Sequence, residues 1–490
     1  MKRLILLVFL LLTALFFLFP ESQDKWKKEL DKYSTIFFIL KENYYKAIDT
    51  EKTVFNSISG FLKSLDPHSY FLDPLTLRSM LEDQRGNYYG IGIRIIKYED
   101  RLTILNLLKD TPAFNSGILP GDVITEIDGM PTKTMTLDEA VKQLRGTRAT
   151  RVNIKIIRQG VDTPLHFKIK RAEIPLDSIS YALPHPLKPE IGYISIRTFG
   201  HNTPREFEDK LKEMIDHQKI KGLIIDLRGN SGGLLQAAIE ISDFFLEKGK
   251  TIVSIKTKFS KQTYPAKKNN RFEWYPLVIL INRQSASASE IVASALKDHN
   301  RATIIGTRSW GKGLVETVYQ LPLNCAMALT TAKYYTPSNK LIQRDYSVYD
   351  RYFSILQDAN YDKNEDIRGG VFPDILIKDD SYSPFIIDLI SKGIFFSFTR
   401  KLIESHFPIT KNFISDGSII KHFKKFLREK NINYNTDIFD SNLKMVQYEI
   451  ERDVLSNQFS SDEGIKVFLK RDPVTKKAVE ILEELLEKGA

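Results

Sequence analysis

The stretch LVILINRQSASASEIVASAL, residues 277–296, sets the fold and the chemistry expected of this chain. It begins with an uninterrupted apolar run, Leu277–Asn282, which is typical of a buried strand. Serines alternating with alanines follow, and from Ile291 the apolar residues recur at helical spacing. A serine at such a strand-to-helix turn can expose its hydroxyl beside helix N-terminal amides, which favour negative charge. The stretch therefore predicts an α/β layer with a nucleophilic serine at its edge.

A lysine between two glycines, Gly311-Lys312-Gly313, follows the next predicted strand, Ala302–Gly306. Serine and lysine can act together as nucleophile and general base. The lysine has to be neutral to accept the serine proton, and burial or nearby positive charge favours the neutral amine. The pair predicts a hydrolase.

Strands alternate with helices on both sides of this stretch. The further strands are expected at Ile191–Phe199, Gly222–Leu227 and Thr251–Lys256, and the helices at Thr203–His217 and Leu234–Leu246. This alternation implies parallel pairing in an α/β layer structure.

The chain divides into five expected parts: 1–23, a signal peptide or anchor; 24–84, helical; 85–172, β-rich; 173–378, the α/β core; and 379–490, helical. The β-rich part has short alternating strands, an Asp128-Gly129 turn and a helix at Leu137–Leu144. The fold class is thus α/β, in an α+β multidomain arrangement.

Composition describes an ordinary globular chain, because 42% of the 490 residues are hydrophobic and 27% charged. The net charge of +10 comes from basic residues spread along the chain, so we expect solvated surface and no nucleic-acid partner. Cys325 is the only cysteine, in an apolar segment, and is expected to be buried. The 8 histidines have no ligand spacing, so neither a metal nor another cofactor is expected.

The N-terminus has the pattern of a targeting signal, because Lys2 and Arg3 precede an apolar run from Leu4 to Phe19. This pattern is typical of a secretory signal or a short anchor, and the absence of a small-x-small site near Pro20 favours the anchor. We therefore expect the rest of the chain outside the cytoplasm, in the periplasm or cell envelope, held at the inner membrane.

A set of motifs resembles one family in its order along the chain. The motifs are Leu65-Asp66-Pro67-His68-Ser69, Gly90-Ile91-Gly92-Ile93, Leu119-Pro120-Gly121-Asp122, Asp226-Leu227-Arg228-Gly229-Asn230-Ser231-Gly232-Gly233, Ser287-Ala288-Ser289-Glu290, Gly311-Lys312-Gly313, Tyr334-Tyr335-Thr336-Pro337 and Gly369-Gly370-Val371-Phe372-Pro373-Asp374. The family is the carboxyl-terminal processing (tail-specific) serine proteases. The resemblance covers about 35–378 and implies a PDZ domain ahead of a crotonase-like, ClpP-like α/β protease core.

The resemblance implies a role for each matching residue. Ser287 becomes the nucleophile and Lys312 the base, at the family's separation of 312 − 287 = 25 residues. The oxyanion of the tetrahedral intermediate would accept hydrogen bonds from the peptide N–H of Ala288 and from that of Gly232 or Gly233. In the PDZ part, Gly90, Ile91, Gly92 and Ile93 resemble the loop that binds a peptide's terminal carboxylate, although the two isoleucines fit core positions equally well. Glu290 is expected to stabilise its helix rather than to react.

Glu316 departs from the family, which has glutamine four residues after the lysine to orient the amine. An ionised carboxylate in contact with Lys312 favours the charged amine, which is the wrong form for a base. Three resolutions stay open: a protonated Glu316, a side chain that points away, or an enzyme that works best at higher pH. Glu316 could also be an ordinary strand residue that faces the solvent and has no role in catalysis.

Two rival functions remain. Gly229-Asn230-Ser231-Gly232-Gly233 resembles the trypsin-like active-site signature, which would make Ser231 the nucleophile with His185, His201 or His217 as base. A catalytically inactive PDZ adaptor is the other. The expected function is an endopeptidase that recognises protein substrates by their C-terminal tails, with self-association through the N- and C-terminal helical regions.

Overall fold

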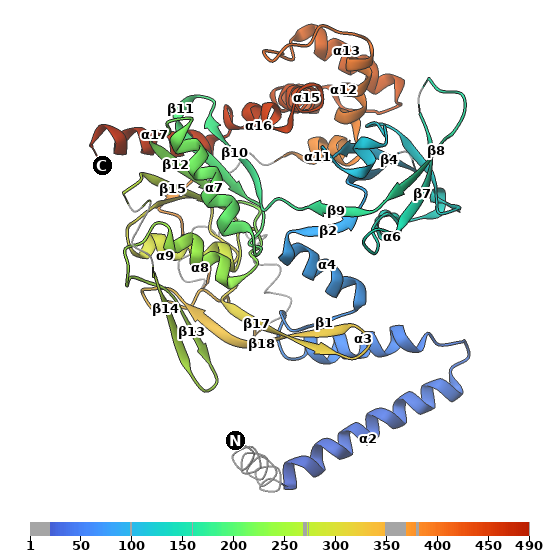
Figure 1. Cartoon of the computed structure of the whole chain (residues 1–490), viewed down its shortest axis with the longest axis vertical. Helices are drawn as coiled ribbons and strands as arrows, with labels where there is room; N and C mark the ends of the chain where they lie inside the picture. Colours follow the sequence, from blue (N-terminus) through green and yellow to red (C-terminus); the bar gives the residue numbers. More distant parts are fainter. Residues whose placement is uncertain are drawn as a thin grey trace.

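The computed structural model describes residues 20–98, 100–158, 160–267, 272, 274–347, 369–378 and 382–489. Figure 1 shows an α/β body joined to a small β domain, to N-terminal helices and to a C-terminal helical region. The expected anchor, Leu4–Phe19, lies outside the described residues. Within them, no helix has both the length and the apolar character needed to cross a membrane.

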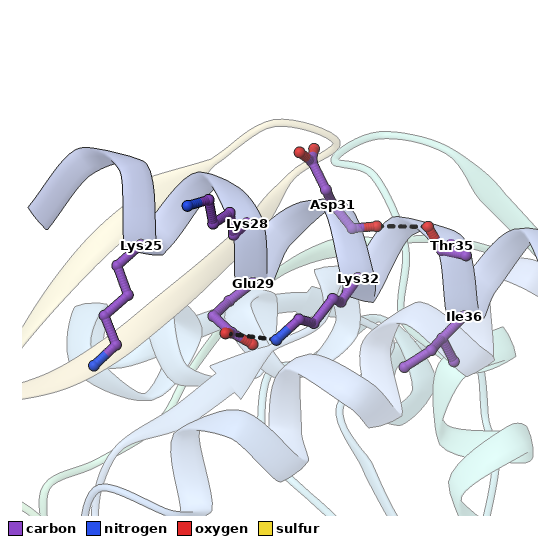
Figure 2. A pocket seen from close by; sticks show the side chains of 7 residues that line it. All are labelled: Lys25, Lys28, Glu29, Asp31, Lys32, Thr35 and Ile36. Atoms are coloured by element: carbon purple, nitrogen blue, oxygen red, sulfur yellow. Dashed lines mark hydrogen bonds and ion pairs between the residues drawn. The ribbon is translucent and has the colours of Figure 1, made fainter. Parts of the chain in front are cut away.

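The N-terminal region is helical, as expected. Its helices are α2 (Pro20–Asn43), α3 (Thr50–Lys63) and α4 (Pro74–Arg85). Helix α2 projects from the body (Figure 1), and the Tyr33 hydroxyl donates a hydrogen bond to Ser57 of α3. Figure 2 shows charged side chains of α2, where Lys32 pairs with Glu29 at 2.9 Å.

The core is a six-stranded sheet. Its strands, in spatial order, are β10 (Ile179–His185), β11 (Lys188–Ile196), β12 (Gly222–Asp226), β15 (Leu277–Ile281), β16 (Thr303–Gly306) and β19 (Ile375–Leu376). Strands β11 to β19 pair in parallel, and β10 is an antiparallel edge strand. The expected parallel α/β layer is confirmed.

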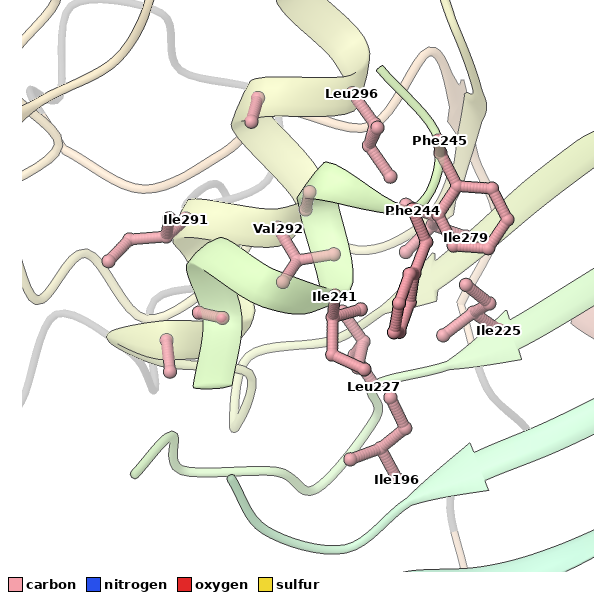
Figure 3. Close-up of a cluster of buried hydrophobic side chains, with 14 of the residues drawn as sticks. Ile196, Ile225, Leu227, Ile241, Phe244, Phe245, Ile279, Ile291, Val292 and Leu296 are labelled. Atoms are coloured by element: carbon pink, nitrogen blue, oxygen red, sulfur yellow. The ribbon is translucent and has the colours of Figure 1, made fainter. Parts of the chain in front are cut away.

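Both faces of this sheet are covered, which is why every residue of β12 and β15 is buried. Side chains alternate between the faces along each strand. Ile225 and Ile279 pack with α8 and α9 (Figure 3), whereas Ile224 and Val278 pack with α17. The covering helices are α7 (Thr203–Asp216), α8 (Leu235–Asp243), α9 (Ala288–Asp298) and α17 (Pro473–Glu487).

A second, antiparallel sheet lies against the core. Its strands are β1 (Tyr70–Leu72), β13 (Thr251–Thr257), β14 (Lys261–Pro265), β17 (Leu314–Leu321) and β18 (Cys325–Tyr335). The expected strand at Thr251–Lys256 exists, but its parallel pairing was wrong: it forms a hairpin with β14 and pairs antiparallel with β18. Strand β1 pairs with β18, so the N-terminal region contributes to this sheet.

The small β domain has its own core. Its elements are β3 (Ile93–Tyr98), β4 (Arg101–Leu107), α5 (Pro112–Asn115), β5 (Val123–Ile127), β6 (Met130–Pro131), η1 (Thr132–Thr134), α6 (Leu137–Leu144), β7 (Arg151–Ile157) and β8 (Leu165–Lys170). Helix α6 has the predicted bounds, and a capping box of Thr136 and Glu139 fixes its start. A two-stranded ribbon of β2 (Asn87–Gly90) and β9 (Ala172–Pro175) connects the domain to the body.

The C-terminal region is helical and contacts both the small β domain and the α/β core. Before α17 it contains α11 (Pro384–Ser391), α12 (Ile394–Glu404), α13 (Gly417–Glu429), α14 (Thr436–Ser441), α15 (Leu443–Gln458) and α16 (Ser461–Leu469). Arg400 donates to the Pro120 carbonyl of the small domain, and Asp472 lies 2.8 Å from Arg228 of the core. Because α17 covers one face of the sheet, this region completes the core.

Candidate active site

Ser287 stands where the sequence places it, at the turn between β15 and α9. It precedes the first residue of α9 and has a φ of 55°, a conformation that costs a non-glycine residue energy. Its peptide N–H donates to Glu290 Oε2 at 2.8 Å. A neighbouring side chain thus helps to hold this backbone conformation.

Lys312 lies on the loop between β16 and β17, and its amine faces Glu316. Lys312 Nζ is 3.0 Å from Glu316 Oε1, and the two side chains are 23% and 17% exposed. The side chain of Glu316 is therefore neither solvent-facing nor turned away, and both of those expectations were wrong. Burial raises the pKa of Glu316, and the positive charge of Lys312 opposes that rise.

Glu290 joins the two loops that carry these residues. Its buried carboxylate accepts hydrogen bonds from the peptide N–H groups of Ser287, Gly311 and Lys312, at 2.8, 2.7 and 2.9 Å, and from the Ser309 hydroxyl at 2.5 Å. Burial raises the pKa of Glu290 to about 7, against the effect of these donors. The expected structural role of Glu290 extends beyond its own helix to the lysine loop.

The glycine turn packs directly on the serine. A Cβ built on Gly232 would lie 2.8 Å from Ser287 Cβ and 3.1 Å from the Ala288 nitrogen, and the φ of Gly232 is +108°. Only glycine fits this position. The Gly232 N–H already donates to Asn230 Oδ1 at 2.8 Å. Of the predicted oxyanion donors, Ala288 and Gly233 are therefore the better candidates.

One cavity brings the predicted residues together. It measures about 660 Å³, and its lining includes Ser287, Ala288, Lys312, Glu316, Gly232 and Gly233. Ser231 also lines it, but His185, His201 and His217 do not. The histidine base that the Ser231 alternative requires is therefore not among the residues that line this cavity.

The N-terminal region builds part of this site, which sequence reasoning did not predict. Tyr70 and Leu72 of β1 line the cavity. The preceding turn is fixed by Asp66, which accepts hydrogen bonds from the Ser69 hydroxyl at 2.7 Å and the Thr330 hydroxyl at 3.0 Å. Burial, and then the charge of Lys312, lower the pKa of His68 to about 4. The Asp66-Pro67-His68-Ser69 motif was the signal in the sequence, but there it supports only the family resemblance.

A second cavity, of about 280 Å³, lies in the small domain. It is lined by Gly90, Ile91, Gly92 and Ile93 together with residues of β3, β4 and α6. Gly92 has a φ of +83°, and a Cβ there would lie 2.3 Å from the Thr111 side chain. Ile91 is 2% exposed and belongs to the domain core, as the core interpretation expected.

Comparisons with known proteins give two matches within the chain and several over most of it. Residues 190–350 match peptidase family S41, and residues 90–169 match the PDZ domain. A carboxy-terminal-processing protease of Bartonella bacilliformis is 40% identical over 329 residues, which are 66% of this chain and 74% of that protein. CtpA of Bacillus subtilis, a carboxy-terminal processing protease, is 32% identical over 66% of this chain and 69% of its own length.

Among solved structures, a photosystem II D1 C-terminal processing protease is 28% identical. The match covers 70% of this chain and 86% of that one, with a TM-score of 0.38.

Proposed function

This chain belongs to the carboxy-terminal processing proteases of peptidase family S41 and carries a PDZ domain. We propose that it is a serine endopeptidase in which Ser287 is the nucleophile and Lys312 is the general base. The observation that carries the proposal is the Glu290 carboxylate, which binds the peptide N–H groups of both residues. Nucleophile and base are thereby fixed beside one cavity.

The reaction follows from these positions. Neutral Lys312 takes the Ser287 proton while Oγ attacks the scissile carbonyl, and the Ala288 and Gly233 amides stabilise the oxyanion. The C–N bond then breaks, and the Lys312 ammonium protonates the leaving amine. Lys312 next takes a proton from a water molecule as the water attacks the ester carbonyl. When the ester C–O bond breaks, Lys312 returns that proton to Ser287 Oγ, which regenerates the serine and the neutral lysine. No cofactor enters these steps.

Substrate selection is assigned to the small domain. A peptide that pairs with β3 as an added strand would bring its terminal carboxylate to the amides of Gly90–Ile93. The cavity beside them is lined by Ile95, Val141 and Leu144, which suit an apolar C-terminal side chain. We therefore expect protein substrates with free, apolar C-terminal tails.

Two variants and a probe test the proposal. Ser287→Ala should abolish cleavage of a tailed protein substrate and labelling by a fluorophosphonate, whereas Ser231→Ala should keep both. Amidating the substrate's C-terminus should raise KM. Loss of activity in Ser231→Ala alone would favour the trypsin-like alternative. Binding of the tail without labelling or cleavage would favour the adaptor.

The N-terminal helix offers a surface for self-association. Trp26, Leu30, Tyr33, Leu40 and Tyr44 are exposed and, with Phe37, recur every three or four residues, as in the seam of a coiled coil. Five lysines balance five acidic residues in α2, so the helix lacks the net positive charge of a membrane-surface helix. A second copy of α2 is the occupant that fits.

Leu30→Glu should lower the mass measured by light scattering, and Thr35→Glu, which alters the face drawn in Figure 2, should not. An unchanged mass in Leu30→Glu would refute self-association through α2.

We place this protein outside the cytoplasm, with residues 4–19 as its membrane anchor.

A further inference from the structure

We infer that Tyr334 is a positioning residue for this reaction, because its hydroxyl connects the main chains of the nucleophile and the base. The inference depends on the proposed roles of Ser287 and Lys312. Tyr334 lies near the end of β18 and is 1% exposed. Its own N–H donates to the Gly313 carbonyl at 3.0 Å, so its backbone is fixed beside the lysine loop.

The hydroxyl of Tyr334 reaches a carbonyl on each side of the site. It donates to the Lys312 carbonyl and lies 3.2 Å from the Ser287 carbonyl. One phenolic hydrogen is thus shared between two acceptors, as in other three-centre hydrogen bonds.

Glu290 makes the complementary contacts. Its carboxylate accepts the N–H of Ser287 and the N–H of Lys312, whereas Tyr334 binds the carbonyls of the same two residues. Each catalytic residue is therefore held at both of its main-chain polar groups by the same pair of buried side chains.

This double attachment matters because neither residue lies within a helix or strand. Ser287 has a positive φ and precedes α9, whose Glu290 and Ile291 N–H groups also donate to its carbonyl at 2.9 and 3.0 Å. Lys312 lies on the loop that leads into β17. The two buried side chains connect the main chains from which the side chains of Ser287 and Lys312 extend. A shift of about 1 Å in such a pair can lower a rate about 100-fold.

Tyr334→Phe removes the hydroxyl and keeps the ring. We expect kcat to fall at least about tenfold with KM within about twofold, and the rate of fluorophosphonate labelling of Ser287 to fall in parallel. The pH profile should keep its midpoint, because the hydroxyl contacts carbonyls rather than the amine.

Tyr275→Phe is the matched control. Tyr275 is 3% exposed, and its hydroxyl donates to the Ile220 carbonyl in the same core. Both variants should lose thermal stability, but only Tyr334→Phe should lose kcat. Unchanged kcat in Tyr334→Phe, or equal losses in both variants, would overturn the inference.

Ser287→Ala and Lys312→Ala distinguish this result from a failure of the proposed function. If either variant keeps full activity, the proposed dyad is wrong, and the inference fails with it. If both are inactive and Tyr334→Phe behaves as the wild type, the dyad stands and only the positioning role is refuted.

Discussion

Replacing Glu316 by glutamine should make this protease more active at neutral pH. Lys312, the proposed base, has to be neutral, and an ionised carboxylate 3.0 Å from its Nζ stabilises the charged form. Two unit charges at that distance attract each other by about 5.5 kcal/mol at an effective dielectric constant of 20. Partial exposure of both side chains and the raised pKa of Glu316 reduce this value.

Opposite charges in such contact typically move a titration by about 1–3 pH units. Removing the carboxylate charge should therefore move the midpoint of the acidic limb of kcat/KM to lower pH in Glu316→Gln. Below that midpoint the rate should rise about tenfold, because the neutral amine becomes more abundant. Glutamine keeps an oxygen that can orient the amine, so the gain should not be offset by misplacement.

The assay is kcat/KM on a tailed substrate between pH 5 and 10, with Glu126→Gln as the control. Glu126 lies 3.0 Å from Lys155 in the small domain, so the control removes an equally close carboxylate away from the site. A midpoint that stays in place or rises in Glu316→Gln would refute the reasoning. Complete loss of activity would mean that the carboxylate itself takes part in the reaction.

The other predictions concern the supports of the site. Glu290→Gln should lower kcat about tenfold or more, because an amide cannot accept hydrogen bonds from all four donors. The pKa of Glu290 in the folded protein, about 7, exceeds its ordinary value, so the folded wild type loses stability as the pH rises. Urea unfolding should show that the wild type loses about 1–3 kcal/mol relative to this variant between pH 4.5 and 7. Asp472→Ala breaks the buried contact with Arg228 and the cap of α17, and should cost about 2–4 kcal/mol of stability, clearly more than the exposed cap variant Asp416→Ala costs. Gly232→Ala should abolish fluorophosphonate labelling while the protein still folds, as circular dichroism would check.

Local sequence patterns predicted the elements well where the pattern itself decides the structure. The apolar runs of β12 and β15 identified buried strands, and the bounds predicted for the helix Leu137–Leu144 agree with the structure, in which a capping box fixes its start. The pairing of β13 was not predictable from alternation. It depends on a hairpin with β14 and on contacts with β18, more than seventy residues further along the chain.

The site divides in the same way. Ser287, Lys312 and the glycine turn follow from short motifs and their spacing, and the structure brings them to one cavity. The contributions of Tyr334 and of the Asp66 turn depend on contacts between segments that no short motif relates. Asp66 and Thr330, for example, are 264 positions apart.

These long separations give the protein an order of assembly. A growing chain emerges from its N-terminus, so Asp66 and β1 exist long before β18, the strand they bind. Arg228 is likewise synthesised 244 residues before its partner Asp472, and one face of the core sheet stays exposed until α17 is synthesised. An interrupted chain therefore contains Ser287 without the walls of its site. Translation products that stop between Ser287 and β18 should therefore be inert.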